Sequence, residues 1–155
     1  MARGTQADNA VTVHLIKLAV GVESVEHLAA LQSGRLSEAR AQAREPVLRH
    51  VTRSRPQRAD EVVDGGSLYW VIKRVIQVRQ RVVDLQSAVK ADGRPACALI
   101  LDPGLVRTRP RAHRPFQGWR YLRPEDAPPD GGPGIGSVDA LPNEMVQELR
   151  RLGLL

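Results

Sequence analysis

Arginine and aromatic side chains are concentrated between Arg107 and Tyr121, and together they could bind a phosphorylated ligand. Arginine offers planar, bidentate donors for phosphate oxygens, and an aromatic ring offers a face on which a nucleic-acid base stacks. Single-stranded RNA binding uses both kinds of contact. We therefore predict an arginine and aromatic binding face that also includes arginines from earlier segments. Its members are Arg53, Arg79, Arg81, Arg109, Arg111, Arg114, Trp119, Arg120 and Tyr121.

The same aromatic rings are equally suited to the hydrophobic core. The chain has only five aromatic residues, so the rings near its end could anchor the core while the arginines lie in solvent. Tyr69 and Trp70 lie in an apolar run and favour the core more strongly. Adjacent strand positions face opposite ways, so one of these two rings is a secondary candidate for the functional face. The sequence leaves open which ring this is.

Catalytic groups are sparse. His50 lies between Arg49 and Arg53 and could carry a proton, as could Asp64, and Lys73 is a further secondary candidate. The four histidines and the single cysteine show no metal-ligand spacing, so the sequence predicts no metal site, no cofactor and no identifiable catalytic residue. The glycine run at 131–136 lacks a preceding strand and a following Lys-Ser/Thr, which favours a linker over a phosphate loop.

The order of predicted elements indicates an α+β domain. A helix follows the first strand, and the later strands are joined by short turns that favour a largely antiparallel, barrel-like sheet. We expect a disordered extension over residues 1–10 and a single domain over 11–155. Within it we expect a flexible Pro/Gly-rich segment at 124–140 and a C-terminal helix at 141–153. The predicted strands cover 11–18, 47–53, 67–73, 75–85 and 96–101, the helices 24–42 and 58–64, and an extended edge 107–123.

Charge is distributed unevenly along the chain. The net charge is +6, but residues 40–123 contain 18 Lys and Arg against 7 Asp and Glu. Such an excess attracts nucleic acids or phosphorylated small molecules, unless the acidic ends fold over it. The lone Cys97 fits a reducing cytoplasm. The most apolar N-terminal segment, at 11–22, is too short for a membrane span and includes a histidine and a lysine, so we expect a cytoplasmic protein.

Several segments resemble the bacterial domain of unknown function 1489. They are 11–18, 49–53, 64–73, 79–81 and 114–122. The resemblance implies a cytosolic alphaproteobacterial protein and contributes no catalytic residue. The family pattern implies glycine where Arg74 stands, and the glycine run at 131–136 resembles a local insertion. At the level of fold, the order of elements is similar to small β-barrel RNA-binding domains of the PUA and ASCH type.

Three functional hypotheses follow. The first is a small binding module that engages RNA or another phosphorylated ligand through its arginines, with Trp119 or Tyr121 stacking. The second is an enzyme acting on a phosphorylated nucleotide or a modified base, with His50 or Asp64 as proton carrier. The third is a protein-interaction adaptor whose basic face meets an acidic partner. The sequence leaves the oligomeric state open.

Overall fold

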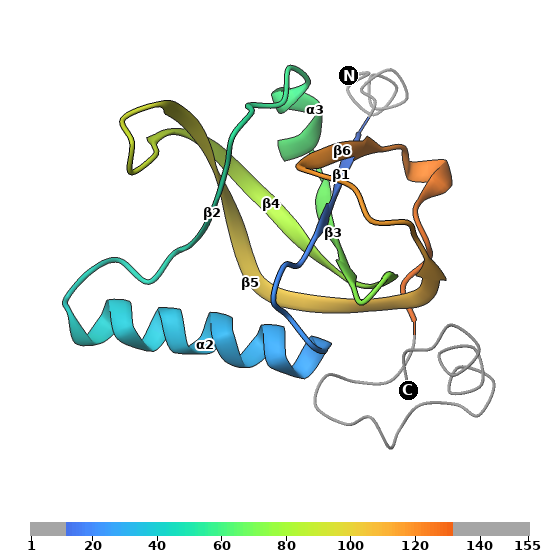
Figure 1. Cartoon of the computed structure of the whole chain (residues 1–155), viewed down its shortest axis with the longest axis horizontal. Coiled ribbons are helices and arrows are strands. Elements are labelled where there is room, and N and C mark those ends of the chain that lie inside the picture. The colour runs from blue at the N-terminus through green and yellow to red at the C-terminus, as the bar shows by residue number, and fades with distance from the viewer. Residues whose placement is uncertain (1–11, 132–155) are drawn as a thin grey trace, which may run out of the picture.

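The computed structural model describes residues 12–131, which form one six-stranded sheet and two α-helices (Figure 1). The strand order is β2-β5-β4-β3-β1-β6. The pair β1 and β3 is parallel and every other neighbouring pair is antiparallel, which confirms the predicted largely antiparallel α+β class. The elements are β1 (His14–Leu18), α2 (Val25–Ala41), β2 (Leu48–Thr52), α3 (Ala59–Val63), β3 (Ser67–Ile72), β4 (Val75–Val89), β5 (Pro95–Ala112), β6 (Trp119–Leu122) and the 3-10 turn η1 (Pro124–Asp126).

The sheet coils but does not close into a barrel. Its central strands β4 and β5 are long, and three register irregularities interrupt their pairing, which allows them to bend. The sheet has β2 and β6 as its two edges, and no strand pairing joins them. Within residues 12–131, side chains of β6 reach across to the backbone that follows β2. We call the gap between β2 on one side and β1 with β6 on the other the seam.

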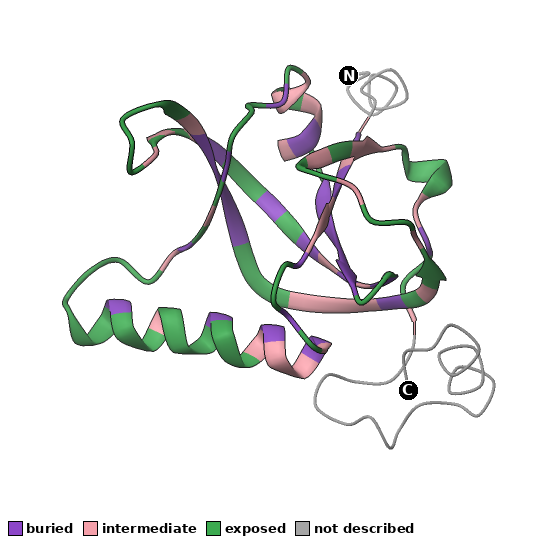
Figure 2. Ribbon diagram, viewed as in Figure 1, coloured by how far each residue is buried: buried purple, intermediate pink, exposed green. Residues whose placement is uncertain are grey.

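Helix α2 lies against one end of the sheet (Figure 1). It begins after Ser24, whose Oγ accepts a hydrogen bond of 3.0 Å from the His27 backbone N–H, as expected for an N-cap. Its buried positions are Val25, Leu28, Gln32 and Ala39, a helical spacing that leaves most of its outer surface exposed (Figure 2). The structure thus confirms the helix predicted at 24–42.

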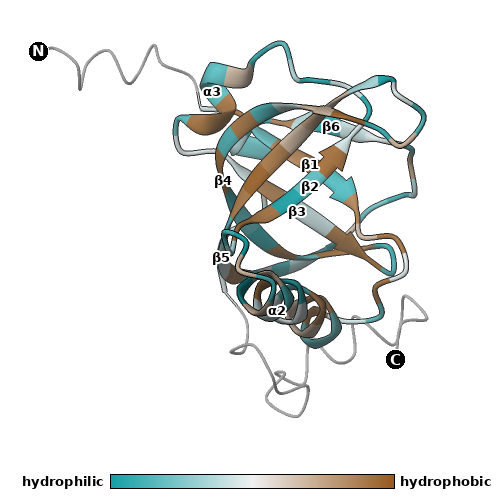
Figure 3. Ribbon diagram, turned by 90° about the vertical axis from the view of Figure 1, so that its left-hand side faces the viewer, coloured by the Kyte–Doolittle hydropathy of each residue, from teal (hydrophilic) through white to brown (hydrophobic). Residues whose placement is uncertain are grey.

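Both faces of β3 are buried, and all six of its residues are inaccessible. Trp70 belongs to the main core inside the coiled sheet, while Tyr69 belongs to a second apolar cluster on the outer face. Phe116 and Leu122 cover that outer cluster. Tyr69 and Trp70 are 4% and 3% exposed, so the expectation that one of them faces a functional surface does not hold. Figure 3 shows polar and apolar stretches alternating along the strands.

β5 is longer than the sequence suggested. We expected the strand to end at Asp102-Pro103-Gly104, but the chain bends there and continues as β5 to Ala112, paired with β4. The expected edge at 107–123 is therefore partly internal. The described part of the Pro/Gly-rich segment also lies along β5, because the backbone N–H of Arg109 donates to the Pro129 carbonyl at 2.9 Å. The extension at 1–10 and the helix at 141–153 lie outside the described residues.

Candidate ligand-binding groove

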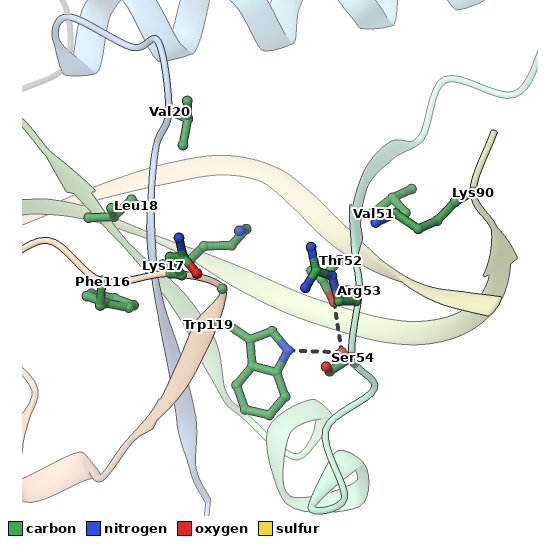
Figure 4. Close-up of a pocket in the computed structure, with 12 residues that line it drawn as sticks. Lys17, Leu18, Val20, Val51, Thr52, Arg53, Ser54, Lys90, Phe116 and Trp119 are labelled. Carbon is green, nitrogen blue, oxygen red and sulfur yellow. Dashed lines mark hydrogen bonds between the residues drawn. The ribbon is translucent and has the colours of Figure 1, made fainter. Parts of the chain in front are cut away.

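The seam opens into a groove of about 740 Å³ (Figure 4). One wall comes from β1 and the residues after it, the opposite wall from β2 and the loop that follows, and a third side from the loop that leads into β6. The lining residues are Lys17, Leu18, Val20, Val51, Thr52, Arg53, Ser54, Lys90, Phe116, Gln117, Gly118 and Trp119. The groove exists because the sheet stops short of closure at this point.

The charges that line the groove all have the same sign. Lys17, Arg53 and Lys90 are its charged residues, and it has no Asp or Glu. Within residues 12–131, no carboxylate forms an ion pair with any of the three. Lys17 follows Leu15 on the inward side of β1, and its partial burial lowers the pKa of its amine. Several cations without a neighbouring carboxylate in the lining favour the entry of an anion.

Aromatic side chains cross one end of the seam. The indole N–H of Trp119 donates to the Ser54 carbonyl at 2.9 Å, as Figure 4 shows. The Trp119 ring contacts the Tyr121 ring edge to face, with centroids 4.9 Å apart. The Tyr121 hydroxyl accepts a hydrogen bond from the backbone N–H of Arg58 at 3.0 Å. Both rings also pack against the main core, so Trp119 anchors the fold and lines the groove at once.

His50 lies on β2, beside the groove. It lines a smaller cavity of about 90 Å³ beneath α2, and its ring contacts Trp70 edge to face at 5.0 Å. Burial first, and then the charges of Lys17 and Arg35, lower the pKa of His50 to about 4. The imidazole is therefore neutral at pH 7. Its Nε2 atom is buried without a hydrogen-bond partner in the part of the chain that the structure describes.

A buried amide network satisfies the polar atom of Trp70. Its indole N–H donates to Oε1 of Gln80 at 3.1 Å, and Gln80 exchanges hydrogen bonds with Gln32 of α2 at 2.9 and 2.8 Å. The Gln80 amide also donates to the Asp102 carbonyl at 2.8 Å. This network joins α2 to β3, β4 and β5. No local sequence pattern predicts this network, because the two glutamines are 48 residues apart.

Of the nine predicted binding residues, the structure brings Arg53, Trp119 and Tyr121 to the seam. Arg79 instead holds both carboxylate oxygens of Asp130 at 2.7 Å. Arg81 is exposed, and its guanidinium lies 3.5 Å from the Val63 carbonyl.

The remaining predicted arginines are dispersed over other surfaces. Arg109 is exposed on β5, and Arg111 donates to the Asp126 carbonyl. Arg120 lies over the Phe116 ring at 5.2 Å, and Arg114 lines a separate cavity. The expected continuous arginine face is thus divided, because register irregularities in the β4–β5 pairing interrupt the regular alternation of side chains near these arginines.

The secondary candidates for the site, Asp64 and Lys73, also lie away from the groove. Asp64 ends α3 and is exposed, and its carbonyl accepts a hydrogen bond from the Thr12 hydroxyl at 2.7 Å. Lys73 pairs with Glu23 at 2.7 Å. Sequence reasoning missed Lys17, Lys90 and Phe116 as groove residues. For Lys17 a signal existed, since it is a charged residue at an inward position of an otherwise apolar strand.

Two further observations concern residues 12–131. None of their helices is long and apolar enough to cross a membrane. They also contain no group of three or more His, Cys, Asp or Glu side chains placed to hold a metal ion.

Comparison with known proteins identifies a family. No curated protein and no solved structure matches the chain. Residues 15–155 match the family described as protein of unknown function (DUF1489), a range that includes the groove and nearly the whole sheet. The chain belongs to the DUF1489 family.

Proposed function

We propose that this protein binds a nucleotide unit, in RNA or as a free phosphorylated nucleotide, in the groove at the seam. The observation that carries the proposal is the arrangement of three cations, Lys17, Arg53 and Lys90, which form no ion pair within residues 12–131 and line the groove together with the Trp119 ring. The cations would hold phosphate oxygens, and the indole would stack against the base. The Ser54 hydrogen bond fixes the indole before the ligand arrives, which reduces the entropy lost on binding.

Two weaker arguments support the same proposal. The chain's order of a helix, a Gly-containing turn and two long strands is similar to small β-barrel RNA-binding domains of the PUA and ASCH type. This analogy concerns the fold, and fold alone does not determine function. The family resemblance also implies an alphaproteobacterial protein of the cytoplasm, where RNA and nucleotides are both present.

The experiment that tests this function compares Arg53→Ala with Arg40→Ala. Arg40 is an exposed arginine in the last turn of α2 and does not line the groove, so the two variants remove the same charge from different places. Binding of a labelled oligouridylate is followed by fluorescence anisotropy over a range of salt concentrations. Loss of one phosphate contact should reduce the salt slope by about 0.7 in Arg53→Ala and leave it unchanged in Arg40→Ala.

A simpler measurement precedes this comparison. Protein purified at low salt should show a raised ratio of absorbance at 260 nm to that at 280 nm, and it should bind heparin near physiological ionic strength. If it carries no nucleic acid, is not retained on heparin and binds neither oligouridylate nor uridine monophosphate, the proposal is wrong. Co-purification of an acidic protein without nucleic acid would favour an adaptor.

One observation favours a second candidate, an enzyme acting on a phosphorylated nucleotide or a modified base. His50 is neutral, its buried Nε2 has no hydrogen-bond partner among residues 12–131, and the charge of Lys17 helps to lower its pKa. A proton acceptor with a pKa of about 4 is a weak base, so we place binding first. Turnover of a nucleotide that disappears in His50→Gln, while binding persists, would establish the enzyme instead.

A further inference from the structure

We infer that the natural ligand is an oligonucleotide rather than a mononucleotide, because a second group of cations lines a cavity that adjoins the groove along the chain. This inference rests on the proposed function. The second group lines a cavity of about 270 Å³ formed by Arg74, Ala112, His113, Arg114 and Pro115. Within residues 12–131, neither Arg74 nor Arg114 forms an ion pair with a carboxylate.

The two cavities adjoin along the chain but remain distinct. Pro115 lines the second cavity and Phe116 lines the groove, and no residue lines both. A single phosphate in the groove therefore does not contact the cations of the second cavity. Arg114 and Trp119 are five positions apart, so their Cα atoms lie within about 18 Å of each other. A ligand must carry several phosphates along its length to reach both places.

The segment at 113–116 forms a ridge between the two cavities, and it is held in place. The backbone N–H of His113 donates to the Arg74 carbonyl at 2.8 Å, which ties the ridge to the β3–β4 hairpin. The His113 ring contacts Phe116 edge to face at 5.0 Å, and the Arg120 guanidinium lies 5.2 Å from the centre of that ring. Arg120 therefore lies beside Phe116 on the outer face of the sheet, whereas Lys17, at the next register position, faces the groove.

This arrangement matches how proteins bind single strands. Such sites combine a basic track for the phosphates with aromatic rings for the bases, and they cover about 4 to 16 nucleotides per domain in known folds. Here the groove supplies the Trp119 ring and three cations, and the second cavity supplies two more cations. A mononucleotide uses the first set only. An oligonucleotide of a few units uses both.

The test is a length series measured with the full chain. Uridine monophosphate and oligouridylates of about two, four and eight nucleotides compete with a labelled octanucleotide in fluorescence anisotropy. We expect affinity to rise by roughly tenfold or more from the monophosphate to the octanucleotide at low salt. Equal affinity across the series would overturn the inference while leaving nucleotide binding in the groove intact. If no member binds, the proposed function fails as well.

Variants show which residues supply the additional affinity for longer ligands. Arg114→Ala and Arg74→Gly should each weaken binding of the octanucleotide and reduce the salt slope of that binding by about 0.7. Binding of the monophosphate should not change. Glycine is chosen at position 74 because its backbone there has φ 68°. Arg40→Ala is the control for a lost exposed charge. The inference is wrong if both variants match this control, or if polyglutamate of similar length competes as well as RNA.

Discussion

The indole N–H of Trp119 and the backbone carbonyl of Ser54 form a hydrogen bond of 2.9 Å that joins the two edges of the sheet. Trp119 begins β6, and Ser54 follows β2, so this contact spans the seam where no strand pairing exists. It also fixes the only tryptophan of the groove in one orientation. The residue that stabilises the opening is thus the residue that we expect to meet the base.

Substitution at Trp119 separates these two roles. Trp119→Phe keeps a stacking face but loses the hydrogen bond, so it should reduce the free energy of unfolding by about 1 kcal/mol and bind RNA with little change. Trp119→Ala should weaken RNA binding by about 1 to 3 kcal/mol at every salt concentration. Urea denaturation and fluorescence anisotropy measure the two effects.

Tyr121→Phe provides the matched control. It removes the hydroxyl that accepts from Arg58, but Tyr121 does not line the groove. It should lower stability without altering affinity. Affinity lost equally in Tyr121→Phe and Trp119→Ala would mean that the rings act through the fold alone.

His50 makes stability depend on pH. Its pKa is about 4 in the folded protein and 6.5 in the unfolded chain, so between these values the unfolded state binds more protons. Stability should therefore fall as pH decreases from about 6.5 to about 4, by up to about 1.4 kcal/mol per unit from this group. His14 acts in the same direction, because burial and the nearby Arg79 lower its pKa too.

Urea denaturation of the wild type and of His50→Gln at several pH values checks this pH dependence of stability. The variant should show a shallower decline in stability over that window. The carboxyl groups of Glu23, Glu61, Asp92 and Asp130 have pKa values below their usual range, so their contributions are lost at lower pH. An identical pH profile for the two proteins would show that His50 does not titrate as the structure implies.

Position 74 links stability to binding. Lys73 and Arg74 form the β3–β4 turn with φ of 51° and 68°, a left-handed conformation that costs a non-glycine residue about 1 to 2 kcal/mol. Arg74→Gly should raise the free energy of unfolding by about 0.5 to 1 kcal/mol, after the greater entropy of glycine in the unfolded chain is subtracted. The same variant should bind the octanucleotide more weakly. Lower stability in thermal denaturation would contradict this account.

Arg79 should contribute to the free energy of unfolding and not to RNA affinity. Its guanidinium already holds both oxygens of Asp130, a partly exposed bidentate pair that fastens residue 130 to β4. Asp130→Asn should therefore cost about 1 kcal/mol of stability at low salt, and less at high salt. RNA affinity should stay unchanged. A marked gain in affinity would show that Asp130 occupies an arginine that the ligand uses.

Two glycines should respond in opposite ways to alanine. A Cβ atom at Gly66 would lie 2.3 Å from the Val62 carbonyl oxygen and 2.4 Å from that of Val13, both backbone atoms. Gly66→Ala should therefore destabilise the protein by more than about 2 kcal/mol. Gly34 lies within α2, and no atom lies within 4 Å of such a Cβ at this position. Gly34→Ala should therefore raise the free energy of unfolding by about 1 kcal/mol. Denaturation midpoints of the two variants provide the measurement.

The local elements were predictable, and their arrangement was only partly so. Ser24 and the apolar spacing after it indicated α2, and the alternation along 75–85 indicated β4, because these signals depend on near neighbours. Asp102-Pro103-Gly104 predicts the end of a strand, but the strand only bends there. Turn residues look the same to a sequence pattern whether the chain reverses or only bends, and pairing with β4 decides between them.

The candidate site was predicted in part for a similar reason. Arg53 and Trp119 were expected to bind, but Lys17 was not, although all three line the groove. These residues come from distant segments that meet only where the two edges of the sheet approach. Along β5 the opposite error arose, since arginines two positions apart have different surroundings where the β4–β5 register is irregular: Arg107 pairs with Glu26, and Arg109 is exposed.

Edge strands commonly expose unpaired amides and carbonyls that invite association with other chains. Here β2 and β6 face each other across the seam, tied by the contacts of Trp119 and Tyr121, so each edge restricts access to the other. We expect this arrangement to protect the two edges against association with other chains, as closure does in a complete barrel. Loosening those two aromatic ties would release both edges together and leave the protein prone to self-association.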